Sequence, residues 1–540
     1  SSLSLTLSYS LLKDTMYRNI VLSSILLLLI VAGSSQAVSI EPQSVKLAFT
    51  NSSSEMRVTW YTTGQGSMPQ LLLSGTKFAM DTVNTTTLLA SNATSINIGQ
   101  WSQWTGYINT AVFNKLEGMT TYYYVCGDQA SQVWSEVFNF TTGALTHSTV
   151  TPFTLAAFGD VGGENGAPTL KNLIATMNNY MFALHVGDIA YADLLTAKAL
   201  GNQSVWDQWL MDANPITSHL PYMTAIGNHD VFSQEQIYLT SFVMPAAVPN
   251  TTWYSFDYNG VHFIAFSYED NFAVDSPQYQ WIHKDLSTFR ASNPNGWIVS
   301  YAHRPMYCSG IDSWCTGAPR AKFAKVMEDI LYTYNVDIYL SGHVHSYERT
   351  LPISKNVTMG TYAAPRATIH CVIGMGGNPG GEVAAFSTPA PEWSTGPRIN
   401  DTGYSTMTFA NATHLHWKFF DNANNSLVDS VWIVKGNFSA SQPTTTSTST
   451  TSTSSTSTTS TTAPATTTST STSTTSTTGP STTSTTSTTG APSTSTTSTS
   501  TTSTTTPPTA TITIGSTTVG SSSKTQSSLL VTIVIAAILS

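Results

Sequence analysis

The chain has 540 residues, of which 40% are hydrophobic, so it is long enough for more than one domain with a buried core. Its charged fraction of 9% is low because a long Ser/Thr tract contributes neither charge nor apolar surface. The net charge is -9 and no run of Lys or Arg occurs, which argues against a nucleic acid or an anionic membrane surface as partner.

An apolar run near the start has the form of a secretion signal. Met16 is the first plausible start, Arg18 precedes the run from Ile20 to Val31, and small residues follow up to Ala37. The run is short for a membrane span, so we expect residues 16–37 to be a signal peptide that is cleaved after Ala37. A signal anchor is the competing interpretation. The first interpretation places the mature protein outside the cell.

Two further features suit an oxidising, secretory environment. Four cysteines allow three pairings, and we favour Cys308 with Cys315 because they close one short loop; two free buried thiols are the alternative. A pair of Cys126 with Cys371 follows only by elimination. Asn-x-Ser/Thr sequons predict a glycan-covered surface, and they begin at Asn51, Asn84, Asn92, Asn139, Asn202, Asn250, Asn356, Asn400, Asn411, Asn424 and Asn437.

Residues 38–145 read as short strands separated by turns. Alternation of apolar and polar residues, as in Met56 to Tyr61, is typical of half-buried strands. We expect a β-sandwich of about one hundred residues, with strands at Val45 to Phe49, Met56 to Tyr61, Gln70 to Leu73, Tyr107 to Phe113, Thr121 to Val125 and Val137 to Thr141. No His or carboxylate cluster occurs there, which indicates a structural or positioning domain.

Residues 150–435 change to strands that alternate with helical segments. Helical spacing recurs at Thr169 to Asn178, Gln278 to Phe289 and Phe323 to Tyr334, and strand-like segments close the region at His414 to Phe420 and Leu427 to Val434. This rhythm predicts an α/β sheet with helices on its faces.

The C-terminal part is of low complexity. Residues 441–510 are Ser, Thr and a few Pro, a composition that cannot bury a core and that resembles an O-glycosylated stalk or a flexible linker. Small residues, a spacer and an apolar tail over 520–540 fit a GPI-anchor signal and so a membrane attachment, or a tail that is simply processed.

The α/β region carries metal-binding residue types at five predicted strand ends. The carboxyl ends of strands in α/β sheets form the ligand crevice, so residues far apart in the chain can converge there. Two His at i and i+2, as at His343 and His345, project to the same side. The five segments are Gly159-Asp160-Val161-Gly162, Gly187-Asp188-Ile189-Ala190-Tyr191, Gly227-Asn228-His229-Asp230, Ala302-His303 and Gly342-His343-Val344-His345.

The order of these motifs resembles that of calcineurin-like metallophosphoesterases. Tyr191, three residues after Asp188, narrows the resemblance to the purple acid phosphatases, and flanking phrases such as His303-Arg304-Pro305-Met306-Tyr307 agree. The resemblance spans about Pro42 to Val434. It implies an α/β metallophosphoesterase sandwich of two mixed sheets flanked by helices, preceded by a fibronectin-III-like β-sandwich.

The resemblance also implies a set of metal ligands. The ferric site would use Asp160, Tyr191 and His345, and Asp188 would bridge to the second metal. Asn228, His303 and His343 would complete a divalent site for Zn, Mn or Fe, whose imidazole and amide ligands differ from the hard oxygens of the ferric site. A metal-bound hydroxide would then attack phosphorus.

Other residues are candidates for contact with the substrate. We expect Asn228, His229 and Arg304 to bind phosphate oxygens, with His229 also a candidate for protonating the leaving group or for orienting a ligand. Plant members of the family often carry histidines in the loop after His303, whereas here that loop has Asp312 and no His. Asp312 is therefore a second candidate for the general acid.

The sequence thus predicts an acid phosphatase that hydrolyses small phosphate monoesters outside the cell, at its surface or in an acidic vesicle. A phosphodiesterase or nucleotide pyrophosphatase could use the same metals, since the metal site does not define the second ester substituent. An inactive, glycosylated surface protein is a third hypothesis, which the presence of suitable ligand types at all seven positions opposes. The oligomeric state is left open.

Overall fold

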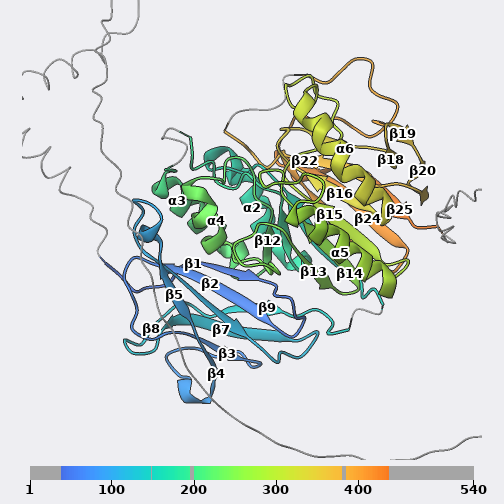
Figure 1. Ribbon diagram of the computed structural model, residues 1–540. Helices are drawn as coiled ribbons and strands as arrows, with labels where there is room; N and C mark the ends of the chain where they lie inside the picture. The colour runs from blue at the N-terminus through green and yellow to red at the C-terminus, as the bar shows by residue number, and fades with distance from the viewer. Residues whose placement is uncertain (1–37, 147–148, 195–199, 380–384, 437–540) are drawn as a thin grey trace, which may run out of the picture. The chain divides into compact units, whose positions relative to one another are not determined.

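Figure 1 shows the computed structural model, which describes residues 38–146, 149–194, 200–379 and 385–436. All of them lie in one compact unit, Ser1–Thr444. The expected signal peptide, stalk and anchor signal and the Asn437 sequon lie outside the described residues. No helix within the described ranges is long and apolar enough to cross a membrane.

The N-terminal part forms two antiparallel sheets, in the order β1-β2-β6-β5 and β4-β3-β7-β8, with β9 paired to β7. All six strands predicted here are present. Val58 and Trp60 of β2 are buried, and Thr59 and Tyr61 are buried too, so both faces of this strand are covered. The strands are β1 (Gln43–Ala48), β2 (Met56–Thr62), β3 (Pro69–Ser74), β4 (Leu89–Asn92), β5 (Thr94–Asn97), β6 (Tyr107–Phe113), β7 (Thr121–Asp128), β8 (Val133–Trp134) and β9 (Phe138–Thr141).

Two mixed six-stranded sheets follow, in the order β12-β11-β10-β23-β24-β25 and β13-β14-β15-β16-β22-β17. Strands β10, β11 and β12 are parallel in the first sheet, and β14, β15, β16 and β22 are parallel in the second. Their bounds are β10 (Phe153–Phe158), β11 (Ala183–His185), β12 (Tyr222–Thr224), β13 (Tyr254–Tyr258), β14 (Val261–Ala265), β15 (Trp297–Tyr301), β16 (Ile338–Ser341), β17 (Tyr347–Arg349), β22 (Ile369–Ile373), β23 (Gly403–Phe409), β24 (His414–Asp421) and β25 (Ser426–Val434).

Five α-helices are described, and short hairpins connect β17 to β22. The predicted helical segments correspond to α2, α5 and α6. The helices are α2 (Ala167–Thr176), α3 (Gln203–Thr217), α4 (Gln236–Ser241), α5 (Pro277–Ser292) and α6 (Ala318–Thr333); the hairpin strands are β18 (Ile353–Ser354), β19 (Val357–Thr358), β20 (Gly360–Thr361) and β21 (Ala364–Pro365).

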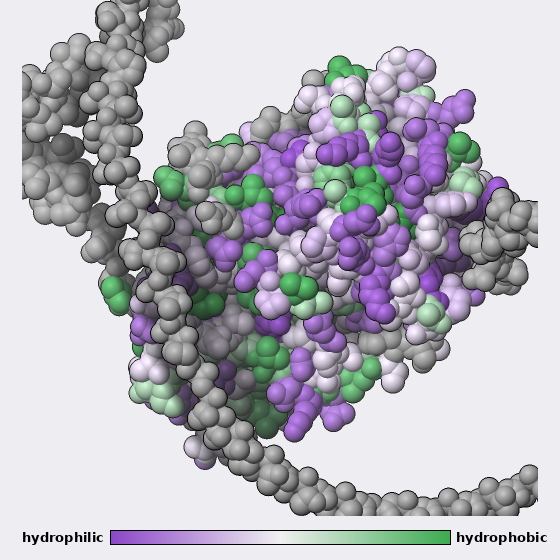
Figure 2. All heavy atoms as spheres, viewed as in Figure 1, coloured by the Kyte–Doolittle hydropathy of each residue, from purple (hydrophilic) through white to green (hydrophobic). Residues whose placement is uncertain are grey.

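Successive side chains of a strand point to opposite faces of its sheet. One set therefore packs in an inner core between the two sheets, and the other set packs in an outer core on each side. In β10, Leu155 and Ala157 join the core shared by the two sheets, whereas Ala156 and Phe158 pack with α2, α3 and α4. Helices α5 and α6 pack over the second sheet (Figure 1) through a separate cluster. Their outer face is mostly hydrophilic with scattered apolar patches (Figure 2), as expected of amphipathic helices.

The end of α3 joins the β-sandwich to the α/β region. The hydroxyl of Tyr124 donates to the carbonyl of Ser218 over 2.7 Å, and the hydroxyl of Thr217 donates to the carbonyl of Val45 over 2.7 Å. The amide of Val45 donates in turn to Oδ1 of Asn214, also over 2.7 Å. These buried polar contacts fix the register of β1 against the helix.

Candidate metal centre

The candidate ligands follow the C-terminal ends of parallel strands. Because β10, β11 and β12 are parallel neighbours, as are β15 and β16, the residues that follow them emerge at one edge of each sheet. Asp160 follows β10, Asp188 and Tyr191 follow β11, Asn228 follows β12, His303 follows β15, and His343 and His345 follow β16.

Four of these residues have a left-handed backbone. The φ angles are 57° at Asp160, 52° at Asp188, 55° at Tyr191 and 64° at His343. Such conformations are uncommon outside glycine, cost on the order of 1–3 kcal/mol each and cluster at functional sites. Here they turn the side chains toward one another at the end of each strand.

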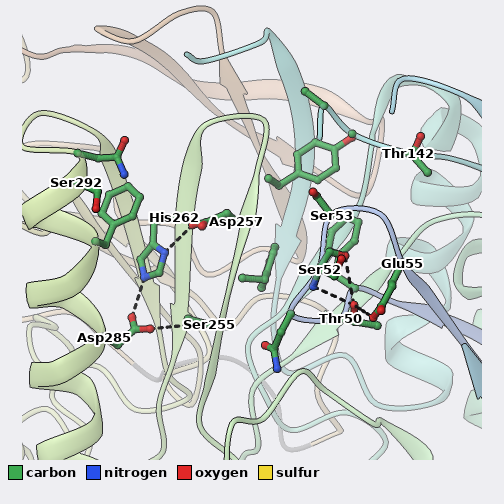
Figure 3. A pocket seen from close by; sticks show the side chains of 18 of the residues that line it. Thr50, Ser52, Ser53, Glu55, Thr142, Ser255, Asp257, His262, Asp285 and Ser292 are labelled. Carbon is green, nitrogen blue, oxygen red and sulfur yellow. Dashed lines mark hydrogen bonds and ion pairs between the residues drawn. The ribbon is translucent and has the colours of Figure 1, made fainter. Parts of the chain in front are cut away.

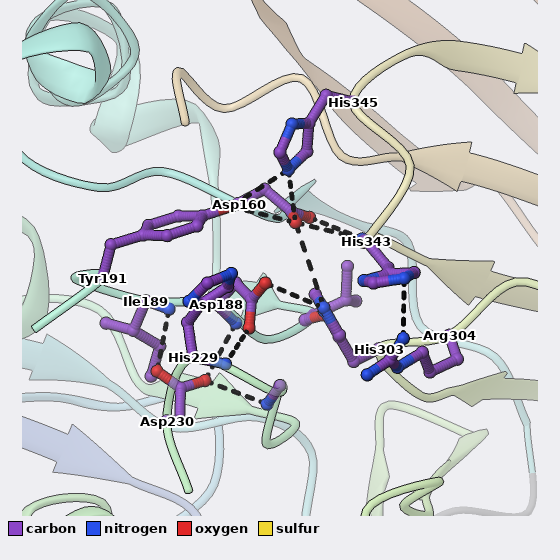
Figure 4. Close-up of polar contacts among 12 residues, drawn as sticks. Asp160, Asp188, Ile189, Tyr191, His229, Asp230, His303, Arg304, His343 and His345 are labelled. Atoms are coloured by element: carbon purple, nitrogen blue, oxygen red, sulfur yellow. Dashed lines mark hydrogen bonds and ion pairs between the residues drawn. The ribbon is translucent and has the colours of Figure 1, made fainter. Parts of the chain in front are cut away.

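One group of side chains gathers around Asp160 (Figure 4). The hydroxyl of Tyr191 lies 3.3 Å from Oδ1 of Asp160 and 3.1 Å from Nε2 of His345. Nε2 of His345 is itself 3.4 Å from the same carboxylate oxygen. Three oxygen and nitrogen donors from three loops thus converge on one point.

A second group gathers around Asp188. One potential ligand atom from each of Asp188, His303 and His343 lies within 4.8 Å of the others. Nε2 of His303 is 3.0 Å from Oδ2 of Asp188 and 4.0 Å from Oδ1 of Asp160, so it connects the two groups.

Burial and the two carboxylates shift the pKa values of the neighbouring candidate ligands. Burial disfavours charge on His303, but Asp188 and Asp160 outweigh it and raise the pKa of the ring to about 9. Burial and the charges of the same two carboxylates hold the pKa of the Tyr191 phenol well above its ordinary value. A phenolate therefore needs a positive ion beside it.

The remaining ligand types are also compatible with metals. Burial, together with His303 and Arg304, holds the pKa of His343 well below its ordinary value, so the ring is neutral, as a ligand must be. Oδ1 of Asn228 is buried and has no hydrogen-bond partner within the part of the chain that the structure describes. The donor set therefore fits a pair of metal ions.

Two further carboxylates support the site through hydrogen bonds. The sequence-based hypothesis gave neither of them a role. Asp230 accepts hydrogen bonds from the amides of Asp188 at 2.8 Å, Ile189 at 3.0 Å and Gly227 at 2.9 Å, and thereby ties two ligand loops together. Burial and the charge of Asp188 raise the pKa of Asp230 to about 7. Its place in the Gly-Asn-His-Asp motif was the only signal in the sequence.

The second brace is Asp193, which holds His229. Its carboxylate oxygens lie 2.8 and 2.9 Å from Nδ1 of His229, and its side chain is only 4% exposed. The ring of His229 lies against Tyr191, with centroids 4.5 Å apart, and its amide donates to Oδ1 of Asp188 over 2.7 Å. The predicted substrate-binding histidine is thus fixed beside both groups of ligands.

Arg304 also lies at the site. Its Nε donates to Glu269 over 2.9 Å, and its Nη1 donates to Nε2 of His343 over 2.7 Å. Its guanidinium lies over the rings of Tyr268 and Trp314, 5.0 and 4.7 Å from their centroids.

Asp312, the second candidate for the general acid, lies in the loop after β15, where its Oδ2 is buried and has no hydrogen-bond partner among the described residues. Its Oδ1 accepts hydrogen bonds from the amides of Trp314 at 2.9 Å and Cys315 at 3.0 Å. These contacts cap a turn of the loop. Within the described residues, no hydrogen bond joins Asp312 to a candidate metal ligand.

The structure joins Cys308 to Cys315, with Cα atoms 5.5 Å apart. The pairing of Cys126 with Cys371, reached by elimination, is wrong here, since both are free, buried thiols. They lie on β7 and β22, which belong to different sheets, so an oxidising compartment alone does not bring them together. Burial raises the pKa of Cys126 to about 12, which keeps that thiol protonated.

Of the eleven sequons, ten begin at described residues, and none of those ten asparagines is buried. The sequon side chains at Asn84 and Asn202 accept hydrogen bonds from the first turn of a 3-10 helix and of α3. The described positions are compatible with glycan attachment.

A separate cleft of about 500 Å³ lies where the β1–β2 loop, β13 and α5 meet (Figure 3). The side chain of His262 lies in the wall of this cleft and connects two carboxylates, with Nδ1 2.7 Å from Asp257 and Nε2 2.8 Å from Asp285. None of the predicted metal or substrate residues is among the described residues that line it. The imidazole ties β14 to α5, and we assign it a structural role.

The fold and the strand-end site together define a metal-dependent phosphoesterase. Three family descriptions match in sequence: purple acid phosphatase N-terminal domain over residues 42–142, calcineurin-like phosphoesterase over 153–347, and iron/zinc purple acid phosphatase-like protein C over 367–430. Acid phosphatase type 7 of Mus musculus is 34% identical over 353 residues, 61% of this chain and 77% of the relative. The chain belongs to the purple acid phosphatase family.

Other relatives agree. Acid phosphatase type 7 of Danio rerio is 31% identical over 73% of this chain and 91% of the relative, and purple acid phosphatase 22 of Arabidopsis thaliana is 31% identical over 62% and 74%. The purple acid phosphatase from yellow lupin seeds has a TM-score of 0.65 at 24% identity, covering 74% of this chain and 75% of that one, and confirms the predicted fold. The family implies a dinuclear centre of iron and another metal.

Proposed function

We propose that this protein is a secreted or cell-surface acid phosphatase that hydrolyses phosphate monoesters at an Fe(III)–M(II) centre, with M as Zn, Mn or Fe. The observation that carries the proposal is that Tyr191, His345, His303 and His343, from the ends of three strands, gather around the buried carboxylates of Asp160 and Asp188. Asp160, Tyr191 and His345 would hold the ferric ion. Asp188 would bridge, and Asn228, His303 and His343 would hold the divalent ion.

The metal pair, when bound, activates water and neutralises charge on the phosphate. Around it, the protein orients the proton-carrying groups. Because Nδ1 of His229 faces Asp193 at 2.8 Å, that nitrogen carries the proton and the ring acts on the substrate through Nε2. His229 is therefore a better candidate than Asp312 for contact with the phosphate and the leaving group, since Asp312 caps its own loop.

Arg304 supports the proposal through a competition with the metal. A neutral imidazole has one lone pair, so His343 can accept from Arg304 or ligate a metal, but cannot do both at once. Metal binding would release Nη1 of Arg304 while Glu269 and the two rings continue to hold the guanidinium. The freed donors suit a phosphate oxygen.

The test is the visible spectrum together with turnover of an aryl phosphate. A phenolate bound to ferric iron should colour the protein, and Tyr191→Phe should remove the colour. Asp188→Ala should abolish hydrolysis. Tyr258→Phe is a matched control, because Tyr258 is equally buried but lies at the separate cleft. A colourless, active wild type would exclude the ferric site and keep the phosphoesterase.

Two alternatives have distinct outcomes. Faster turnover of a diester or a nucleotide pyrophosphate than of a monoester would reassign the substrate class. Metal binding without hydrolysis of any phosphate ester would favour an inactive surface protein. Localisation is tested separately, by recovery of the protein from the culture medium or by its release from cells with a phosphatidylinositol-specific phospholipase.

A further inference from the structure

The loop between β15 and α6 places an indole ring beside the candidate divalent site. Trp314 is 7% exposed, and its ring meets that of His343 edge-on, with centroids 5.2 Å apart at 86°. The ring also meets Tyr268 edge-on at 5.0 Å, and the guanidinium of Arg304 lies over it at 4.7 Å. One buried side chain therefore contacts both a candidate ligand and a candidate phosphate-binding residue.

The loop that carries Trp314 is fixed at several points. The disulfide between Cys308 and Cys315 closes it, and Asp312 caps its turn. The indole Nε1 donates to the carbonyl of Pro305 over 3.0 Å. Arg320, at the start of α6, donates to the carbonyls of Cys315 and Met306 over 2.8 and 2.7 Å. The position of the indole is thus determined by the covalent and hydrogen-bonded frame of the loop.

His343 depends on such packing because it lacks the usual second partner. A histidine that ligates a metal almost always donates its other ring N–H to a carboxylate or carbonyl, which fixes the ring. Among the residues that the structure describes, no carboxylate or carbonyl accepts a hydrogen bond from the ring of His343; its ring contacts are Arg304, Trp314 and His303. Its backbone is left-handed, with φ of 64°, so packing must determine the direction of the side chain.

We propose that Trp314 is a positioning residue. The disulfide loop holds its ring against His343 and Arg304, so that His343 is oriented to bind a metal and Arg304 is oriented to bind phosphate. The proposal rests on the proposed function. Since the indole is buried, it acts through its two neighbours rather than on the substrate.

The experiment compares Trp314→Ala and Trp314→Phe in the full chain with Trp297→Phe as control. Trp297 is also buried and also donates from Nε1 to a backbone carbonyl, at 3.1 Å, but it begins β15 at the end opposite His303. The readouts are the dissociation constant of Zn²⁺ from metal-stripped protein, kcat and KM for an aryl phosphate, inhibition by inorganic phosphate, and the midpoint of thermal unfolding.

We expect Trp314→Ala to weaken Zn²⁺ binding about 10- to 100-fold, as loss of a ligand's supporting contact does, and to raise KM and the phosphate inhibition constant more than it lowers kcat. Trp314→Phe should recover most of the Zn²⁺ affinity, because a ring remains against His343. The paired change Cys308→Ser with Cys315→Ser should act in the same direction as Trp314→Ala. Trp297→Phe should lower the unfolding midpoint without changing Zn²⁺ affinity.

Unchanged Zn²⁺ affinity and KM in folded Trp314→Ala would overturn the proposal. So would equal losses of affinity in Trp314→Ala and Trp297→Phe, because they would indicate general destabilisation. If Trp314→Ala does not fold, the Zn²⁺ affinity of the double serine variant decides: weaker binding than in wild type supports the proposal, and unchanged binding overturns it. Failure of the proposed function looks different, because the wild type itself would then bind no Zn²⁺ or hydrolyse no phosphate ester.

Discussion

The His262 bridge predicts a specific dependence of stability on pH. The ring is 6% exposed and lies between the carboxylates of Asp257 and Asp285. Burial disfavours its charge, but the hydrogen bonds to the two carboxylates outweigh that effect and raise its pKa from 6.5 to about 9. The difference between these values corresponds to about 3 kcal/mol of folding free energy. Solvent screens part of this, because the side chain of Asp257 is 39% exposed, so we expect about 2 kcal/mol.

The sign follows from the direction of the shift. A raised pKa stabilises the folded state fully below pH 6.5, and the contribution is lost as pH rises through about 9. Lys46 acts in the opposite sense, because burial lowers its pKa to about 7 and the unfolded chain then binds the extra proton above that pH. The raw stability curve of the wild type therefore sums these slopes and those of other shifted groups, such as His303 and Asp230, and only a comparison with a variant isolates the contribution of His262.

The assay is urea unfolding of wild type and His262→Gln at several pH values between 5 and 10. The stability difference between them should be largest below pH 6.5 and should shrink by about 2 kcal/mol by pH 9.5. His416→Gln serves as control, because His416 is bonded to Ser430 and has a lowered pKa. A constant difference between wild type and His262→Gln across this range would refute the assignment of a charged bridge.

Three further predictions concern the braces of the site and the β-sandwich. Asp193→Asn should lower kcat about 10²- to 10⁴-fold while Zn²⁺ binding is retained, because His229 loses the partner that fixes its protonated nitrogen; steady-state kinetics and Zn²⁺ titration check it. Asp230→Asn should weaken Zn²⁺ binding about 10- to 100-fold, since an amide cannot accept all three hydrogen bonds that support the Asp188 loop; normal affinity would contradict it. Tyr124→Phe should destabilise the protein by about 1–3 kcal/mol, because a carbonyl at the end of α3 loses its buried donor; urea unfolding measures it, with unchanged kcat as the control.

Much of the fold was predictable because burial imposes a visible period. Alternation in β2 and helical spacing in α5 and α6 were sufficient to predict those elements. Strands β4, β5 and β8 were not predicted, since they are short and none of their residues is buried; Leu89, for example, is 64% exposed. Such strands form because β3, β6 and β7 supply pairing partners, which local sequence does not reveal.

The site divides in a similar way. Residues such as Asp160 and His343 could be proposed as ligands because each follows a strand end, and parallel strands end at a common edge. Asp230 and Trp314 could not be given roles, since these depend on contacts with loops that lie far away in the chain. The contacts of Asp312 could not be predicted either, because its bonds to the amides of Trp314 and Cys315 depend on the turn that the loop adopts.

The geometry of the site makes its stability depend on residues that are not themselves candidate ligands. Four candidate ligands have left-handed backbone conformations, each of which costs on the order of 1–3 kcal/mol. In addition, the two buried carboxylates repel one another unless a cation or a protonated His303 lies between them. An isolated loop would relax from such a state. In this protein the ligand loops are held by the hydrogen bonds of their amides to Asp230 and by the disulfide loop that carries Trp314. They are also held by the two sheets, whose inner faces share one aromatic core. Changes remote from the metals should therefore alter metal affinity whenever they loosen one of these supports.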